Sequence, residues 1–228
     1  MDRIKLSFAA ALAVGVFLAA PAAHGTILVP GQSGVAPDLF AFLPGATVVG
    51  SLSGSFTSVA FTGNYIEEVF VDPANGFGKN DLTWLIQVTN NNGSAGIGRI
   101  TASSFAGFMT DVGTNDIGFV PPGFVGGALP DPDTVDRDVT GAIIGFNYPF
   151  GLGAGRTSVM LEIQTNATAF SAGFISLSGG TLNAATATVP AFAPTSAVPE
   201  PATWAMMLIG FVGLGFVFRQ SRRKVSFA

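Results

Sequence analysis

Hydrophobic and polar residues alternate along the middle of the chain, and this pattern predicts β-strands. In the clearest stretch, 82–89, leucine, tryptophan, isoleucine and valine occupy every second position; threonine and glutamine lie between them, with Leu85 as the one exception. A period of two is typical of a strand that buries one face. Comparable alternation occurs at 97–101, 159–164 and 168–177, and in weaker form at 65–71 and 143–150.

Turn-forming residues separate these stretches at intervals of roughly ten residues. The cluster Asn-Asn-Asn-Gly-Ser at 90–94 predicts a hairpin between strands 82–89 and 97–101, because asparagine and glycine accept positive φ angles. The glycine-rich segment 151–157 predicts a second hairpin; it lacks the lysine and the spacing of a phosphate-binding loop. We expect 123–138 to form a long loop.

Many short strands without a helical stripe predict an all-β fold. We expect a single antiparallel β-sandwich of the jelly-roll or immunoglobulin-like type, occupying residues 26–188. Residues 186–198 are rich in alanine, threonine and proline, and we expect a last strand that runs into a spacer. The spacer, at 189–198, would be a linker that holds the domain off a membrane.

The amino end has the pattern of a secretory signal peptide. Two basic residues lie among the first five, 6–20 is an apolar run, and small residues follow as far as Gly25. Signal peptidase requires small residues near its cleavage point, so we expect a signal peptide at 1–25, cut after Ala22 or Gly25. Export would then proceed through the Sec machinery and across the inner membrane. The alternative for such a run is a buried core helix.

The carboxyl end combines an apolar run with a basic cluster. Residues 202–218 carry no charge, and a helix of this length spans roughly 25 Å, the short end of what a bilayer core requires. The run is apolar all round, which disfavours an amphipathic or buried helix. The basic residues after it stay on the cytoplasmic side, so the body should lie outside. These membrane-stop residues are Arg219, Arg222, Arg223 and Lys224.

A short motif stands at the start of this run: Pro199-Glu200-Pro201, followed by Trp204 and Ala205. The motif, the apolar span and the basic cluster together resemble a PEP-CTERM sorting tail. The resemblance implies recognition by exosortase, a membrane-embedded protease or transpeptidase that removes the helix near Pro-Glu-Pro. It also implies a Gram-negative host that makes exopolysaccharide. The protein would be membrane-anchored in transit and would then reside at the cell surface or outside the cell.

The composition excludes several kinds of chemistry. The chain has no cysteine, and its one histidine, His24, falls within the predicted signal peptide. Thiol nucleophiles, cysteine-ligated metals and a Ser–His–Asp triad are therefore excluded. Between residues 26 and 198, twelve acidic residues stand against four basic ones, a net charge of −8. Such a body repels phosphate, so we expect no nucleic-acid partner.

The densest acidic cluster lies at 131–138 and is a candidate Ca²⁺ site, because loop carboxylates are hard oxygen ligands. Its spacing departs from that of an EF-hand. The alternative is a solvated acidic loop with Arg137 as internal counter-ion. Apart from Ca²⁺ we expect no cofactor. The four candidate ligands are Asp131, Asp133, Asp136 and Asp138.

The remaining acidic and aromatic residues do not indicate a further functional site. Glu67 and Glu68 are adjacent, so on a strand they point to opposite faces and cannot form the facing pair that a glycosidase needs. Trp84, Tyr65 and Tyr148 could stack on sugar rings. However, Trp84 falls on the apolar face of its strand, and phenylalanine dominates the aromatics, as in a core.

The sequence therefore predicts an exported, non-catalytic cell-surface or extracellular-matrix protein. It would be tethered by its carboxyl-terminal helix, processed by exosortase and associated with exopolysaccharide or biofilm, and we expect no catalytic residue. The alternative is a carbohydrate-binding module or a carbohydrate-active enzyme of the envelope. An exposed aromatic platform, or a cleft with two facing carboxylates, would favour that alternative.

Overall fold

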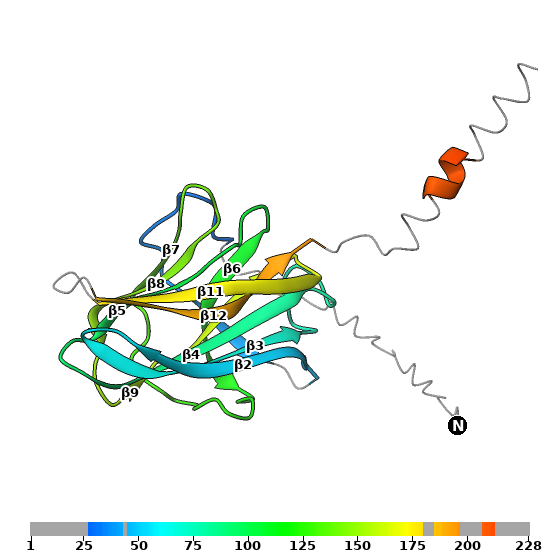
Figure 1. Ribbon diagram of the computed structural model, residues 1–228. Helices are drawn as coiled ribbons and strands as arrows, with labels where there is room; N and C mark the ends of the chain where they lie inside the picture. The colour runs from blue at the N-terminus through cyan, green and yellow to red at the C-terminus, as the bar shows by residue number, and fades with distance from the viewer. Residues whose placement is uncertain (1–26, 43–44, 180–184, 197–206, 213–228) are drawn as a thin grey trace, which may run out of the picture.

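A computed structural model describes residues 27–42, 45–179, 185–196 and 207–212 (Figure 1). The predicted signal peptide at 1–25 lies outside the described residues. Of the helix expected at 202–218, the structure describes 207–212, which are helical and exposed. Among the described residues, no helix has the length and hydropathy needed to cross a membrane.

The described chain forms two β-sheets packed face to face, and one core cluster joins them. The pairing is antiparallel except between β1 and β6, which run parallel. The seven-stranded sheet has the order β1 (Asp38–Phe42), β6 (Thr110–Gly118), β10 (Met160–Thr165), β4 (Leu82–Gly93), β3 (Phe61–Val71) and β2 (Thr47–Thr57), with β9 (Arg156–Thr157) beside β4. The five-stranded sheet has the order β12 (Thr186–Thr195), β11 (Ala169–Gly179), β5 (Ile97–Ala102), β8 (Ile144–Leu152) and β7 (Thr134–Arg137).

The alternation of apolar and polar residues along β4 explains which side chains it turns toward the core. Its inward residues, among them Trp84 and Ile86, have no exposed surface, and the Trp84 ring meets Phe105 edge-on at 5.6 Å between centroids. Leu85, the exception in the pattern, points to the outer face but is also fully buried. A second, smaller cluster covers it there, in which Phe124 lies on the segment after β6. The middle of the seven-stranded sheet is therefore covered on both faces.

Both predicted hairpins are wrong. Residues 90–93 continue β4, and the chain then passes from one sheet to the other at 94–96, because β4 pairs with β3 and β10 whereas β5 pairs with β8 and β11. The buried amide of Asn90 holds this crossing by donating to the Leu152 carbonyl at 2.9 Å. The segment 151–157 also crosses between sheets, since β8 lies in the five-stranded sheet and β9 pairs with β4.

Two boundaries also differ from the prediction. The expected linker at 189–198 is strand for most of its length, because β12 continues to Thr195 and pairs with β11 throughout. Alternate small residues face the core, and its prolines are tolerated because β12 is an edge strand. The expected loop at 123–138 contains β7, whose outer edge is bridged by Val35.

Arg137, at the end of β7, ties together one end of the sandwich. Its guanidinium is 4% exposed, and its five N–H groups all donate to neutral oxygens at 2.8–3.0 Å. A guanidinium has five donors, so none is left unsatisfied. The acceptors are the Thr110 hydroxyl and the carbonyls of Leu28, Phe105, Phe108 and Gly141.

Replacing Arg137 by lysine should destabilise the fold, because an ammonium has three donors and lacks the fork that reaches all five acceptors. We expect Arg137→Lys to lower the free energy of unfolding by about 3 kcal/mol, since buried acceptors are left unpaired. The urea midpoint measures the change. Arg156→Lys, at an exposed arginine, is the control. Equal midpoints for the two variants would contradict the assigned role of Arg137.

Candidate functional site

The end of β12 is the first candidate, because the predicted sorting motif follows it. The strand ends at Thr195, and four residues later the chain reaches Pro199. This stretch of chain can span at most about 14 Å. The remaining sorting and membrane-stop residues also lie outside the described residues: Glu200, Pro201, Trp204, Ala205, Arg219, Arg222, Arg223 and Lys224.

The last strand is held along both of its edges. One edge pairs with β11, from Ser178 opposite Thr186 to Ala169 opposite Thr195. On the other edge, two side chains of β3 reach across from the seven-stranded sheet. The Phe192 amide donates to Glu67 Oε2 at 2.7 Å, and the Tyr65 hydroxyl donates to the Pro190 carbonyl at 2.8 Å. Backbone groups that an edge strand would leave open are thus satisfied within the sandwich.

Aromatic packing supports the same junction. The rings of Phe170 and Phe192 meet edge-on with 5.0 Å between centroids, and β2 passes beside them at Gly50. A Cβ atom at Gly50 would lie 2.9 Å from the Phe170 ring, so a larger residue there would displace the pair. The absence of a side chain at Gly50 therefore lets β2 approach β12 closely.

Glu67 carries the unusual electrostatics of this junction. It has no exposed surface, and its Oε1 atom has no hydrogen-bond partner among the described residues. Burial raises the pKa of Glu67 to about 8, and the bond from the Phe192 amide offsets only part of that rise. The carboxyl group is therefore largely protonated at neutral pH. Its neighbour Glu68 points to the outer face and accepts from the Ser51 hydroxyl.

A second group of buried acids lies on the outer face of the seven-stranded sheet. Glu162 is 1% exposed and accepts from Asn115 Nδ2 and Gln164 Nε2, each at 2.8 Å. Burial raises the pKa of Glu162 to about 7, and the charges of Asp72 and Asp111 add to the effect. This carboxyl has no route to a substrate, because neighbouring amides occupy both of its oxygens and it is shielded from solvent.

Asp111 belongs to the same group and is coupled to Asp38 on β1. Burial, together with a hydrogen bond and repulsion from Asp38, raises the pKa of Asp111 to about 7. Two carboxyl groups that share a proton in this way favour the state with one negative charge. Even so, among the described residues no three acidic or histidine side chains come together as a set that could hold a metal ion.

The four aspartates proposed as Ca²⁺ ligands do not share one site, and two of them are bonded to other groups. Asp136 forms an ion pair with Arg99 and accepts from Asn147 at 2.6 Å. Burial opposes ionisation of Asp136, but these bonds hold its pKa below the usual value. Asp138 accepts from the Ile143 amide at 2.9 Å. Arg99, rather than Arg137, is therefore the counter-ion here.

Asp131 and Asp133 have exposed side chains. The structure does not gather the four aspartates into a cage: Asp136 and Asp138 each have partners of their own, and no metal-holding group occurs in the described segments.

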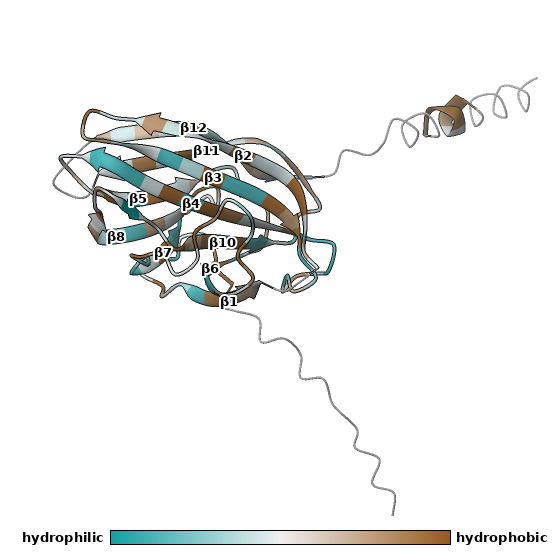
Figure 2. Cartoon of the chain, turned by 90° about the horizontal axis from the view of Figure 1, so that it is seen from below, coloured by the Kyte–Doolittle hydropathy of each residue, from teal (hydrophilic) through white to brown (hydrophobic). Residues whose placement is uncertain are grey.

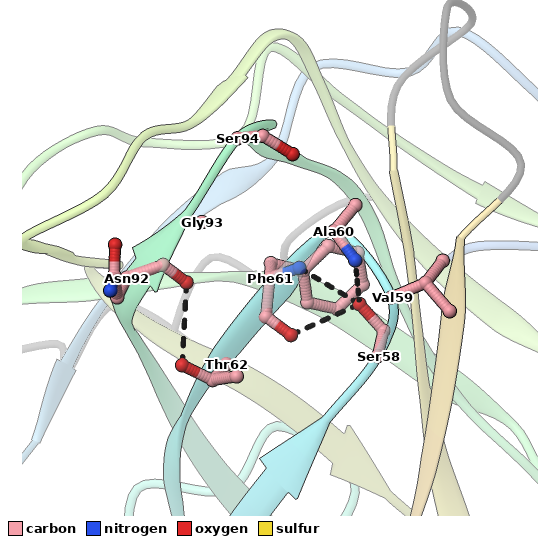
Figure 3. A pocket seen from close by; sticks show the side chains of 8 residues that line it. All are labelled: Ser58, Val59, Ala60, Phe61, Thr62, Asn92, Gly93 and Ser94. Carbon is pink, nitrogen blue, oxygen red and sulfur yellow. Dashed lines mark hydrogen bonds between the residues drawn. The ribbon is translucent and has the colours of Figure 1, made fainter.

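Two shallow pockets are lined entirely by uncharged residues. The first, of about 280 Å³, lies where β2 turns into β3 beside the end of β4 (Figure 3). The Ser58 hydroxyl in this pocket donates to the Phe61 carbonyl and accepts from the Phe61 amide, so it is already engaged. The second pocket, of about 310 Å³, lies between β3, β4 and the 123–125 segment. Neither pocket offers an acid, a base or an activated nucleophile.

The aromatic residues considered for sugar stacking are buried. Trp84, Tyr148 and Tyr65 are 0%, 2% and 5% exposed. The expectation that Trp84 packs in the core is confirmed. These three rings therefore form no platform on the surface.

Sequence reasoning missed the role of Glu67 and Tyr65. One signal was present: on β3 the inward positions run Tyr65, Glu67, Val69, so a carboxylate interrupts an apolar face. A charged residue at an inward position needs a partner. That partner lies on β12, which had been assigned largely to a linker.

Replacing Glu67 by glutamine should remove part of the pH dependence of stability. The raised pKa means that native Glu67 keeps a proton which the unfolded chain loses above pH 4.5. Its contribution is full below that pH and is lost as pH rises through about 8. Glu67→Gln keeps an acceptor for the Phe192 amide and cannot ionise. At pH 9 we expect it to exceed wild type in unfolding free energy by on the order of 3 kcal/mol.

The measurement is urea denaturation at pH 5, 7 and 9. Asp133→Asn, at an exposed acid, is the matched control and should follow the wild-type curve. A Glu67→Gln curve parallel to wild type across this range would show that Glu67 ionises freely in the folded protein.

Calcium should leave the melting temperature unchanged, because Asp136 is neutralised by Arg99 and Asp138 accepts from the backbone. The test compares thermal unfolding in millimolar Ca²⁺, in Mg²⁺ and in chelator. A saturable rise in melting temperature with Ca²⁺ alone would restore the calcium site.

Comparison with known proteins gives one match. The model of the PEP-CTERM protein-sorting motif matches residues 197–224, which include the motif, the apolar run and the basic cluster. No curated protein and no solved structure matches the chain. The match confirms the resemblance seen in the sequence. The chain is therefore an exported protein that carries a PEP-CTERM sorting motif, the signal for exosortase processing in Gram-negative bacteria.

Proposed function

We propose that the protein is a non-catalytic component of the cell surface or extracellular matrix. Its sandwich is held at the membrane by a helix at 202–218 until exosortase cuts near Pro199–Pro201, and it then joins an exopolysaccharide layer or biofilm. One observation carries the proposal: the last strand is locked into the sandwich and ends four residues before the sorting motif. The folded domain itself is therefore what the tail delivers.

The bonding of the acids supports a role without catalysis. Glu67 accepts from the backbone of β12, Glu162 from two side-chain amides, and Asp136 from Arg99. General acid–base chemistry requires a carboxyl group within reach of a bound substrate. The carboxyls with the most strongly raised pKa values, those of Glu67, Glu162 and Asp111, are instead at most 3% exposed.

Glycan binding is the second candidate, and the first pocket favours it. The pocket lies at the start of β3, whereas β12 ends beside the other end of β3, so a tethered protein would present the pocket away from the membrane. Ser94, Thr62 and Asn92 in its lining carry groups that sugars recognise. Val59 stands 96% exposed beside them, but no aromatic ring lies open there for stacking. A glycan array distinguishes the two proposals.

The intact mass of the protein recovered from its native host tests the main proposal. We expect a chain that begins between residues 23 and 26 and ends near Pro199, because signal peptidase and exosortase each remove one end. A variant with Pro199, Glu200 and Pro201 all changed to alanine should retain the tail through Ala228.

The control for this experiment is Asp133→Asn, which should be trimmed like wild type. A wild-type mass that still includes Arg219 to Ala228 would mean a permanent anchor and would reject exosortase release. Binding of the released protein to a defined glycan would instead favour the second candidate.

A further inference from the structure

Three of the four edge strands in the described sandwich are protected against pairing with another chain. β12 carries Pro190 and Pro194, and Glu67 and Tyr65 occupy its outer backbone groups. β7 has four residues and is bridged by Val35 on its outer side. β1 has five residues and begins with an aspartate. Short strands, prolines and charges are the usual means by which sheets avoid edge-to-edge association.

β2 is not short and has no proline, charge or bridging segment, although at Gly50 it lies close to β12. It is eleven residues long, contains no proline and no charged residue, and most of its residues are exposed. It pairs with β3 on one side only, and among the described residues no other backbone group bonds to it. Figure 2 shows it at the edge of the seven-stranded sheet opposite β1. A long, uncharged and open edge is a template for strand addition.

The sequence of β2 indicates what would pair with it. It reads Thr-Val-Val-Gly-Ser-Leu-Ser-Gly-Ser-Phe-Thr and is nearly symmetric about Leu52. When two copies of a strand pair antiparallel about a two-fold axis, each residue lies opposite its mirror position in the sequence. An axis at Leu52 places glycine opposite glycine and serine opposite serine. The matched positions are Gly50 with Gly54, Ser51 with Ser53, and Thr47 with Thr57.

The packing of β2 explains why its inner face can tolerate this arrangement. Cβ atoms at Gly50 and Gly54 would approach Phe170 and Tyr65 to 2.9 and 3.0 Å, so both positions are filled from within the same copy. The bulge at Val49 interrupts the register with β3 and marks the end of the regular segment. Residues 50–54 are therefore the part of the edge that is regular, open and symmetric.

We propose that β2 pairs antiparallel with β2 of a second copy, about a two-fold axis at Leu52, so that two seven-stranded sheets become continuous. Few backbone hydrogen bonds join the copies, and each body has a net charge of −8, so the two copies repel each other. The dimer therefore forms at high local concentration, and salt strengthens it by screening this repulsion.

Sedimentation of the protein over a range of concentrations tests the pairing. The sample is the form that the host releases. If the host retains the tail, the full chain in detergent micelles is used instead. The test of β2 pairing therefore does not depend on whether exosortase removes the tail. We expect a monomer–dimer equilibrium in wild type. Ser53→Asp with Ser55→Asp, at exposed positions of β2, should raise the dissociation constant at least about tenfold, because the carboxylates introduced at position 53 of the two copies lie diagonally across the axis and four negative charges are added along the shared edge.

The matched control is Leu39→Asp with Ala41→Asp, which adds the same charge at exposed positions of β1, the opposite edge of the same sheet, and should change the constant less than about twofold. A wild-type protein that stays monomeric at all concentrations and in high salt would overturn the proposal. So would equal weakening by the two double variants.

A cross-link then tests the register, which is practical because the chain has no cysteine of its own. Ser51→Cys copies mixed with Ser53→Cys copies should form a disulfide-linked dimer under mild oxidation, because these positions lie opposite each other. Ser55→Cys copies alone should not, because their sulfurs are offset along the strand by about 20 Å. Equal yields from the two samples would overturn the assigned axis.

Discussion

One buried guanidinium, that of Arg137, holds the end of the sandwich at which the described chain begins. Its five donors join the turn at Gly141 that follows its own strand to two segments distant in sequence, residues 105–110 and the segment around Leu28. A small exported domain often secures such pieces with disulfides, but this chain has no cysteine. Arginine can take that role because its planar fork satisfies several acceptors at once. Through Thr110 it also fixes the start of β6, the strand that carries Asp111.

β4 and β10 were predictable because apolar and polar residues alternate along them with a period of two, even though both faces of these strands are buried. Their partners were not. Residues 90–94 are typical of a hairpin turn, yet 90–93 extend β4 and the chain then crosses to the other sheet, since only long-range packing decides which edge the next strand meets. Leu85 is an apolar residue on the otherwise polar face of β4. Such a residue indicates that a second layer covers this face, and in the structure that layer lies around Phe124.

The two parts of the candidate site differ in the same way. The sorting motif could be predicted in full because it is a linear signal, read by an enzyme from adjacent residues and a span. The clamp formed by Glu67 and Tyr65 could not, because it requires knowing that β12 lies against β3. The composition of β12 does not distinguish a strand from a linker. Alternating alanines and threonines with two prolines are typical of a spacer, and they equally suit an edge strand with small side chains.

The end of β12 also determines how the domain responds to force. If the tail is anchored as proposed, drag on the sandwich is transmitted to Thr195, and a pull along the strand axis loads the whole of β12. The bonds to β11 and those from Glu67 and Tyr65 lie across that axis. They are therefore loaded in parallel, and the strand can leave only by shearing all of them together. A tether attached to a loop would instead peel its contacts one at a time, so this attachment suits a protein that is exposed to flow.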